Sequence, residues 1–217
     1  MLRYLDVQNI LDKNDLVLQE SGCVGSENER GNTYMKKIGI VTDSHSSISQ
    51  EEAEKLGIFV LPMPFYIDGE CFYESVTLSR ELFFEKLAAG ADITTSQPSP
   101  TAVMEIWDKA LEQFEKILYM PISSGLSGSY ETAMMLAKDE AYEGRVLVVD
   151  DGQVAAPLHQ MVLDTLDMIE KGYEAEQIRD LLERAGDRMM IYIALQTLEC
   201  LKKGGRVTPA AAALGSV

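Results

Sequence analysis

Short apolar runs alternate along this chain with longer segments whose apolar residues recur at helical spacing. The runs at 38–41, 58–63, 117–120 and 145–149 have the length and composition of buried strands. Helical patterns lie between them, and strands that are joined through a helix run parallel to one another. The pattern therefore predicts an α/β fold, with a parallel sheet flanked by helices in a Rossmann-like N-terminal domain.

The first helix has clear signals at both of its ends. Ser49 and Glu52 have the spacing of a capping box, and Gly57 is placed to end the helix after about Leu56. The strand predicted at 58–63 follows directly. We therefore expect a strand–helix–strand unit at the start of the sheet.

Residues 65–92 interrupt this alternation. Apolar positions alternate on both sides of Asp68 and Gly69, a dipeptide that is typical of hairpin turns. Ser79 is then a suitable N-cap for an amphipathic helix over 80–89, which Gly90 ends. We interpret residues 65–92 as a hairpin and helix inserted into the α/β domain.

The patterns divide the chain into three segments. Residues 1–34 have weak periodicity and a polar end, so we expect an N-terminal extension that is disordered or loosely helical. Residues 35–153 form the predicted α/β domain. Residues 154–217 begin a second, α+β domain with a strand at 189–194, and its last helix, over 208–214, has only just begun. We expect this second domain to be truncated at the C-terminus.

The loop that follows the strand at 117–120 has the composition of an anion-binding site. Residues 123–129 read Ser-Ser-Gly-Leu-Ser-Gly-Ser, and a helix is predicted to begin near Ser127. Gly125 and Gly128 allow backbone N–H groups to approach a ligand closely, and the serines offer neutral donors. A helix N-terminus adds about half a positive charge. The loop is therefore predicted to bind an anion without a cationic side chain.

A second loop of similar character precedes another helix. Residues 94–100 read Thr-Thr-Ser-Gln-Pro-Ser-Pro, in which Ser99 is a suitable N-cap and Pro100 a suitable first helical residue. The helix is predicted to extend to about Phe114. Two hydroxyl-rich loops at helix N-termini indicate one pocket between them.

Composition narrows the classes of partner. The chain has 19 basic and 35 acidic residues and a net charge of −16, so neither nucleic acid nor an anionic membrane surface is an expected partner. No apolar run approaches the length of a membrane span, and we expect no stable membrane insertion.

The 3 cysteines are far apart, which indicates reduced thiols and a cytoplasmic location. The 2 histidines are also far apart, so we expect neither a metal site nor a cofactor.

Four short motifs together resemble the DegV family of bacterial fatty-acid-binding proteins, in the same order and at similar spacing. The resemblance covers residues 35–217. The motifs are Lys37-Ile-Gly-Ile-Val-Thr-Asp-Ser44, Thr95-Ser-Gln-Pro-Ser99, Ser123-Ser-Gly-Leu-Ser-Gly128 and Leu201-Lys-Lys-Gly-Gly-Arg206.

The resemblance implies a carrier of a long-chain fatty acid rather than an enzyme. It implies that the fatty acid lies between two domains and that a separate fatty-acid kinase converts it to an acyl phosphate. The family's carboxylate-binding hydroxyls correspond to Thr95 and Ser127, with Gly128 N–H as a further donor and Ser96 beside them. Arg206 corresponds to an arginine of the kinase-facing surface.

Two other functions remain open from the sequence. Ser127 is the possible nucleophile of a serine hydrolase, with His45 or His159 as base, although the motif lacks the final glycine of a nucleophile elbow. The hydroxyl-rich loops also suit a small phosphorylated ligand, although no nucleotide-binding motif is present.

Overall fold

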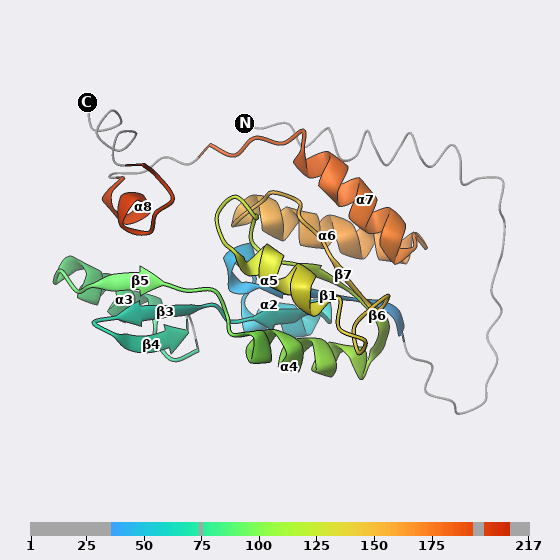
Figure 1. The fold of residues 1–217 in the computed structure, drawn as a ribbon, viewed down its shortest axis with the longest axis horizontal. Coiled ribbons are helices and arrows are strands. Elements are labelled where there is room, and N and C mark those ends of the chain that lie inside the picture. The colour runs from blue at the N-terminus through green and yellow to red at the C-terminus, as the bar shows by residue number, and fades with distance from the viewer. Residues whose placement is uncertain (1–35, 74–75, 193–197, 209–217) are drawn as a thin grey trace. The chain divides into compact units, whose positions relative to one another are not determined.

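The structure is a computed structural model that describes residues 36–73, 76–192 and 198–208 (Figure 1). The chain divides into two units, Met1–Met35 and Lys36–Val217. The predicted extension at 1–34 lies outside the described residues, and so does nearly all of the helix predicted at 208–214. The predicted domain boundary at residue 153 stays a prediction.

A four-stranded parallel sheet forms the core of the described chain (Figure 1). Its strands are β1 (Lys36–Asp43), β2 (Phe59–Leu61), β6 (Phe114–Met120) and β7 (Val146–Val148). The strand order is β2-β1-β6-β7, and every neighbouring pair is parallel. The buried apolar residues of β1, β6 and β7 are consecutive rather than alternating, as expected for a sheet covered on both faces. The predicted fold class is confirmed.

Helices pack against both faces of this sheet. They are α2 (Gln50–Leu56), α4 (Pro100–Leu111), α5 (Ser129–Leu136), α6 (Ala156–Glu170) and α7 (Ala175–Gly186). Helices α4 and α5 share one hydrophobic core with the sheet, whereas α6 and α7 lie on the opposite side from α4 (Figure 1). On that side, Thr165 Oγ1 of α6 donates to Met120 Sδ at 3.6 Å. None of the described helices has the length and apolar character that crossing a membrane requires.

Three aromatic rings hold α4 on the sheet. Trp107 is fully buried, and its ring packs edge-to-face against Tyr119 and Tyr142 with centroids 5.3 Å and 5.2 Å away. The Tyr142 hydroxyl donates to Asp108 at 3.0 Å. Because α4 is fixed in this way, its first turn is fixed too. The loop predicted at 94–100 is shorter in the structure, since residues 93–95 form a strand, and only residues 96–99 lead into that turn.

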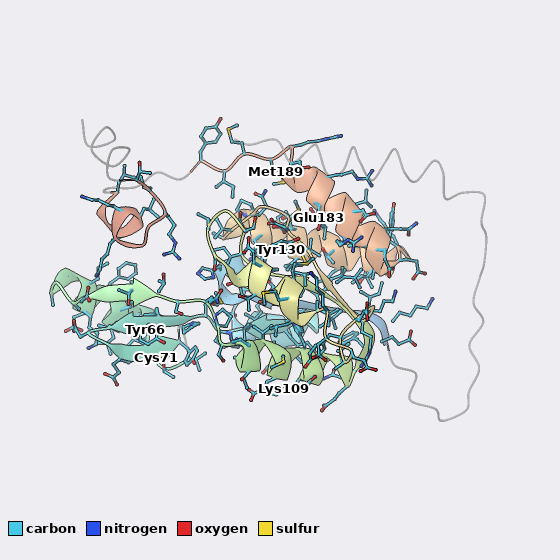
Figure 2. All side chains as sticks on the ribbon, in the orientation of Figure 1. Tyr66, Cys71, Lys109, Tyr130, Glu183 and Met189 are labelled. Atoms are coloured by element: carbon cyan, nitrogen blue, oxygen red, sulfur yellow. The ribbon has the colours of Figure 1, made fainter. Side chains whose placement is uncertain are left out.

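The chain between β2 and α4 forms a second, antiparallel sheet. Its strands are β3 (Pro64–Ile67), β4 (Glu70–Tyr73) and β5 (Ile93–Thr95), in the order β4-β3-β5. Asp68 and Gly69 have positive φ angles of 51° and 85°, as a tight hairpin turn requires, so the predicted hairpin is confirmed. Tyr66 of β3 pairs with Cys71 of β4 (Figure 2).

Helix α3 (Arg80–Ala88) follows this hairpin. Ser79 caps it as predicted, accepting a hydrogen bond from Leu82 N–H at 3.3 Å. We predicted an amphipathic helix here, and this prediction was wrong. The apolar residues of α3 are adjacent in sequence and therefore occupy more than one face of the helix. Phe83 packs against Phe65, whereas Phe84 is 51% exposed.

Two helix boundaries and one predicted strand differ from the expectation. Helix α4 ends at Leu111, and Phe114 begins β6, where its ring packs edge-on against Phe59 of β2. Helix α5 begins at Ser129, with Gly128 as its N-cap. Residues 189–192 form no strand, and the rest of the strand predicted at 189–194 lies outside the described residues. The last described helix is α8 (Glu199–Lys203).

Candidate anion-binding site

The serine-rich loop lies at the carboxyl edge of the main sheet, where β1 and β6 are neighbours. The chain leaves β1 toward β2 on one side and leaves β6 toward β7 on the other. In open parallel sheets, ligands bind at this point of reversal. Two loops meet there, one after β1 at 44–47 and one after β6 at 121–128.

Asp43, the last residue of β1, connects these two loops. Its side chain is fully buried. Oδ2 accepts a hydrogen bond from Ile122 N–H at 2.8 Å, and Oδ1 accepts one from His45 N–H at 2.9 Å. His45 Nδ1 also lies 3.3 Å from Asp43 Oδ1. Asp43 therefore fixes the base of the site, a role that the sequence analysis did not assign to it.

The start of α5 presents donors at this edge. Ser127 Oγ accepts a hydrogen bond from Ser129 N–H at 3.3 Å and lies 2.8 Å from Ser129 Oγ. When the Ser129 hydroxyl is the donor of that contact, the Ser127 hydroxyl keeps its proton for a ligand. Gly128 N–H has no acceptor within the described part of the chain. Two donors are thus available at a helix N-terminus, where a negative charge is favoured.

The loop before α4 meets the same helix. Thr95, the last residue of β5, is exposed, and the Ser96 hydroxyl donates to the Gln97 carbonyl at 3.0 Å. Gln97 Oε1 accepts a hydrogen bond from Thr132 Oγ1 of α5 at 3.2 Å. The same oxygen lies 3.2 Å from the position that a Cβ on Gly128 would occupy. Gln97, which the sequence analysis did not select, therefore joins the two predicted loops.

Arg206 also contacts the serine-rich loop. Its Nε donates to the Leu126 carbonyl at 3.2 Å, one residue before Ser127. Lys203 forms an ion pair with Asp92, which directly precedes β5. The end of α8 and the residues after it therefore contact the serine-rich loop and the residue before β5, while the Arg206 side chain stays exposed.

The loop after β7 forms hydrogen bonds with the serine-rich loop. The Gln153 carbonyl accepts a hydrogen bond from Ser123 N–H at 3.0 Å, and Asp150 Oδ1 accepts one from Ser124 N–H at 3.3 Å. Asp151 is 1% exposed, and its Oδ1 accepts a hydrogen bond from Gln153 N–H at 2.9 Å. The pKa of Asp151 is raised to about 7, mainly by burial and in part by the charges of Asp150 and Asp43, while the hydrogen bond from Gln153 N–H acts in the opposite direction.

Two further groups near Asp150 come from neighbouring helices, Tyr130 of α5 and Glu183 of α7. Figure 2 labels both side chains. Asp150 N–H donates to Glu183 Oε1 of α7 at 3.5 Å. Burial raises the pKa of Tyr130 of α5, and the negative charges of Glu183 and Asp150 raise it further. The outer side of this loop is therefore acidic, which disfavours a second anion there.

The described contacts do not bring a catalytic base to Ser127. His45 contacts Asp43, and His159 Nε2 lies 3.2 Å from Glu52 Oε1. Ser127 contacts Ser129 instead. Within the same described ranges, no three His, Cys, Asp or Glu side chains form a group that could hold a metal ion.

A cavity of about 310 Å³ lies at the opposite edge of the sheet. Its lining includes Ile38, near the start of β1, whereas Asp43 ends that strand. Five residues of extended strand separate these two positions, which is roughly 16 Å. The cavity is therefore separate from the candidate site. The lining residues are Lys37, Ile38, Ile169, Gly172, Tyr173 and Glu174.

These features define an α/β protein with a candidate anion-binding site at the reversal point of a parallel sheet. Residues 37–217 match the family described as "Uncharacterised protein, DegV family". The chain therefore belongs to the DegV family, as the four motifs indicated.

Relatives with curated sequences match along most of this chain. A DegV domain-containing protein of Caldanaerobacter subterraneus subsp. tengcongensis is 30% identical over 183 residues, which are 84% of this chain and 65% of that protein. A DegV domain-containing protein of Deinococcus radiodurans is 34% identical over 181 residues, 83% of this chain and 64% of that one. The chain thus spans slightly less than two thirds of the length of these relatives.

Solved structures of the family share this fold. A DegV family protein from Thermus thermophilus, described by its fatty acid binding, is 34% identical with a TM-score of 0.74. The comparison covers 83% of this chain and 64% of that one. A stearic-acid-binding protein from Eubacterium ventriosum is 26% identical with a TM-score of 0.69, over 84% of this chain and 64% of that one.

Proposed function

We propose that this chain binds a long-chain fatty acid and holds its carboxylate between the loops that precede α4 and α5. Thr95, the Ser127 hydroxyl and Gly128 N–H are the proposed donors. The observation that carries the proposal is the start of α5, where Gly128 N–H has no acceptor among the described residues and Ser127 Oγ lies one residue before it. A second hydroxyl-rich loop is brought into contact there by Gln97. The fatty-acid-binding relatives from Thermus thermophilus and Eubacterium ventriosum support it.

Neutral donors suit a carboxylate at this position. Hydrogen bonds to a charged group contribute about 1.5–3 kcal/mol each, and the helix N-terminus adds a favourable field. Ser96 is a weaker donor in the proposal, because its hydroxyl donates to the Gln97 carbonyl and must turn away to reach a ligand. The buried carboxylate of Asp43 lies below the site, where it orders the loops through backbone N–H groups.

The acyl chain provides the rest of the binding free energy in this proposal, at roughly 0.8 kcal/mol for each buried methylene. This chain supplies the loops that hold the carboxylate. The part of the family's fold beyond the shared 64% of the Thermus thermophilus protein is the proposed second wall of the acyl site.

We further propose that the bound fatty acid is presented to a separate kinase that forms an acyl phosphate, and that the protein is not itself an enzyme. The exposed cations at the end of α8, in a chain of net charge −16, are a local surface on which an acidic partner can dock. A cytoplasmic location belongs to the same proposal, and the free, exposed thiols of Cys71 and Cys200 support it.

The carboxylate donors are tested by two single substitutions. Thr95→Val and Ser127→Ala are each expected to weaken palmitate binding about tenfold or more, because each removes one hydrogen bond to a charged group. Titration calorimetry measures the affinity, and native mass spectrometry reports how much fatty acid the purified chain retains.

Thr94→Val is the matched control. Thr94 is the exposed neighbour of Thr95 on β5, and successive side chains of a strand point to opposite faces. Palmitate affinity should therefore stay within about twofold of wild type in this variant. Unchanged affinity in both Thr95→Val and Ser127→Ala contradicts the proposed site.

The docking role is tested with Arg206→Ala. We expect acyl phosphate formation with a purified fatty-acid kinase to slow about tenfold, since charges at an interface edge act mainly on association. Palmitate affinity should change less, because the contact of Arg206 with the serine-rich loop is to the Leu126 carbonyl and not to a proposed donor. Lys109→Ala, which removes an exposed cation of α4 outside this surface, is the control. Equal turnover of all three proteins argues against docking at Arg206.

A further inference from the structure

We infer that Asp151 is a positioning residue for the Ser127 donor, and that it holds this donor for an anionic ligand while its own carboxyl group is neutral. The inference rests on the proposed function, because Ser127 is a proposed contact of the fatty-acid carboxylate. It gives a role in binding to the loop after β7, which supplies none of the proposed donors.

A chain of hydrogen bonds connects Asp151 to Ser127. Asp151 Oδ1 accepts from Gln153 N–H at 2.9 Å, and the Gln153 carbonyl accepts from Ser123 N–H at 3.0 Å. The Ser123 carbonyl in turn accepts from Ser127 N–H at 3.2 Å. Each of these bonds holds the residue that forms the next one. The position of Ser127 therefore depends on a buried side chain of the neighbouring loop.

The loop that carries Asp151 is itself held in place. Ala155 N–H donates to the His45 carbonyl at 2.7 Å, which ties the loop to the segment after β1. Ala155 has a positive φ of 55°, which costs energy for a residue with a Cβ. Gly186 of α7 packs so closely on the Asp151 backbone that a Cβ at position 186 would clash with it. The Asp151 side chain therefore cannot turn out to water without breaking these contacts.

Asp151 lacks the second donor that a buried carboxylate needs. Asp43, the other buried aspartate at this edge of the sheet, has an N–H donor for each of its two oxygens. Asp151 Oδ2 is buried and has no hydrogen-bond partner among the residues that the structure describes. A buried charge in this situation is costly, so the neutral form of Asp151 is favoured. The pKa of Asp151, which burial raises to about 7, agrees with this geometry.

The surroundings of Asp151 are acidic. The charges of Asp43 and Asp150 both oppose its ionisation. Ionised Asp151 adds a further negative charge to the loop that holds Ser127, which disfavours an anionic ligand there. The titratable groups on the elements around this loop are Asp43 and His45 at the end of β1, Asp150, Tyr130 of α5, His159 of α6, and Arg179 and Glu183 of α7.

The alternative is that Asp151 only stabilises the fold. In that case pH changes the free energy of unfolding but leaves the ligand affinity of the folded protein unchanged. Asp151→Asn separates the two roles, because asparagine keeps an oxygen that can accept from Gln153 N–H and carries no charge at any pH. Both histidines and the ionisation of the ligand are common to the two proteins, so their contributions appear in both pH profiles.

The experiment measures palmitate affinity by titration calorimetry between about pH 6 and about pH 8.5. The proteins are wild type, Asp151→Asn, Asp151→Ala and the control Asp164→Asn. Burial also raises the pKa of Asp164, but this residue accepts from Gln160 of its own helix and lies roughly 12 Å along α6 from the start of that helix. Thermal unfolding of each protein gives a temperature at which all of them are folded.

We expect wild type to bind palmitate about fivefold more weakly at about pH 8.5 than at about pH 6, because Asp151 loses its proton in this range. Asp151→Asn should match wild type at about pH 6 and keep that affinity at about pH 8.5. Asp151→Ala should bind about threefold more weakly than wild type at about pH 6, because Gln153 N–H loses its acceptor. Asp164→Asn should follow wild type throughout.

The outcomes that overturn the inference are distinguishable from failure of the proposed function. If wild type and Asp151→Asn bind palmitate with parallel pH profiles, Asp151 has only a structural role and the proposed function stands. A folded Asp151→Ala variant that binds as tightly as wild type also refutes the positioning role. If this variant does not fold, the comparison of wild type with Asp151→Asn decides alone. If wild type binds no palmitate at any pH, the proposed function fails and the role of Asp151 fails with it.

Discussion

Replacing Asp43 with alanine is expected to lower the free energy of unfolding by about 2–5 kcal/mol, because one buried and one half-buried N–H group then lack their acceptor. Those groups are the N–H of Ile122 and of His45, which the carboxylate accepts at 2.8 Å and 2.9 Å. Urea denaturation at neutral pH measures the loss. Palmitate affinity should fall as well, because the same hydrogen bonds order the loops on both sides of the site.

Asp108→Ala is the matched control for this substitution. The Asp108 carboxylate also accepts a hydrogen bond, from the Tyr142 hydroxyl at 3.0 Å, but the residue is exposed on α4. Water can replace the lost acceptor at a surface, so we expect a loss of about 1 kcal/mol. If the two variants are destabilised equally, Asp43 is not the anchor that its burial indicates.

Asp151→Asn is expected to make the protein more stable at alkaline pH and to remove a pH dependence that wild type has. The folded-state pKa of Asp151 is raised to about 7, whereas its ordinary value is about 3.9. Folded wild type therefore binds a proton more tightly than the unfolded chain. Its free energy of unfolding falls as pH rises from about 4 to about 7 and stays low above that range. Asparagine has no such proton, and its oxygen can still accept from Gln153 N–H.

Denaturation of both proteins across this pH range gives the measurement. At about pH 8 the variant should be more stable by on the order of 3 kcal/mol, and at about pH 4 the difference should be small. The carboxylates of Asp150 and Asp43 face the same region, so the slope of wild type also reflects their charges. Parallel pH profiles for the two proteins would show that Asp151 titrates normally.

Local patterns in the sequence were sufficient to predict much of this fold. Ser49 and Ser99 cap their helices as expected, accepting from Glu52 and Ala102 N–H groups at 3.1 Å and 3.2 Å. The hairpin at Asp68 and the parallel sheet also follow from short-range signals. Each of these features depends on residues only a few positions apart or on a repeated hydrophobic period, and a sequence shows both directly.

Features that depend on distant residues were not predictable in this way. Phe114 continues the helical stripe of α4 in the sequence, but its packing against Phe59 places it in β6. Gln97 is one polar residue in a polar loop, and only the fold brings it to Thr132. Thr95, Ser96, Ser127 and Gly128 were selected as ligand contacts by composition and by family resemblance, and their role stays a prediction.

The residues that build the candidate site are far apart in the sequence, and this separation determines when the site can form. The hydrogen bond from Ile122 to Asp43 joins positions 79 apart, and the contact between Arg206 and Leu126 joins positions 80 apart. Closing such long loops costs entropy before any contact compensates for it, which slows folding. During synthesis, β1 leaves the ribosome before β6 can pair with it. The Asp43 side chain is therefore exposed to solvent until that pairing forms. The proposed site therefore cannot be completed before β6 and the first turn of α5 have left the ribosome.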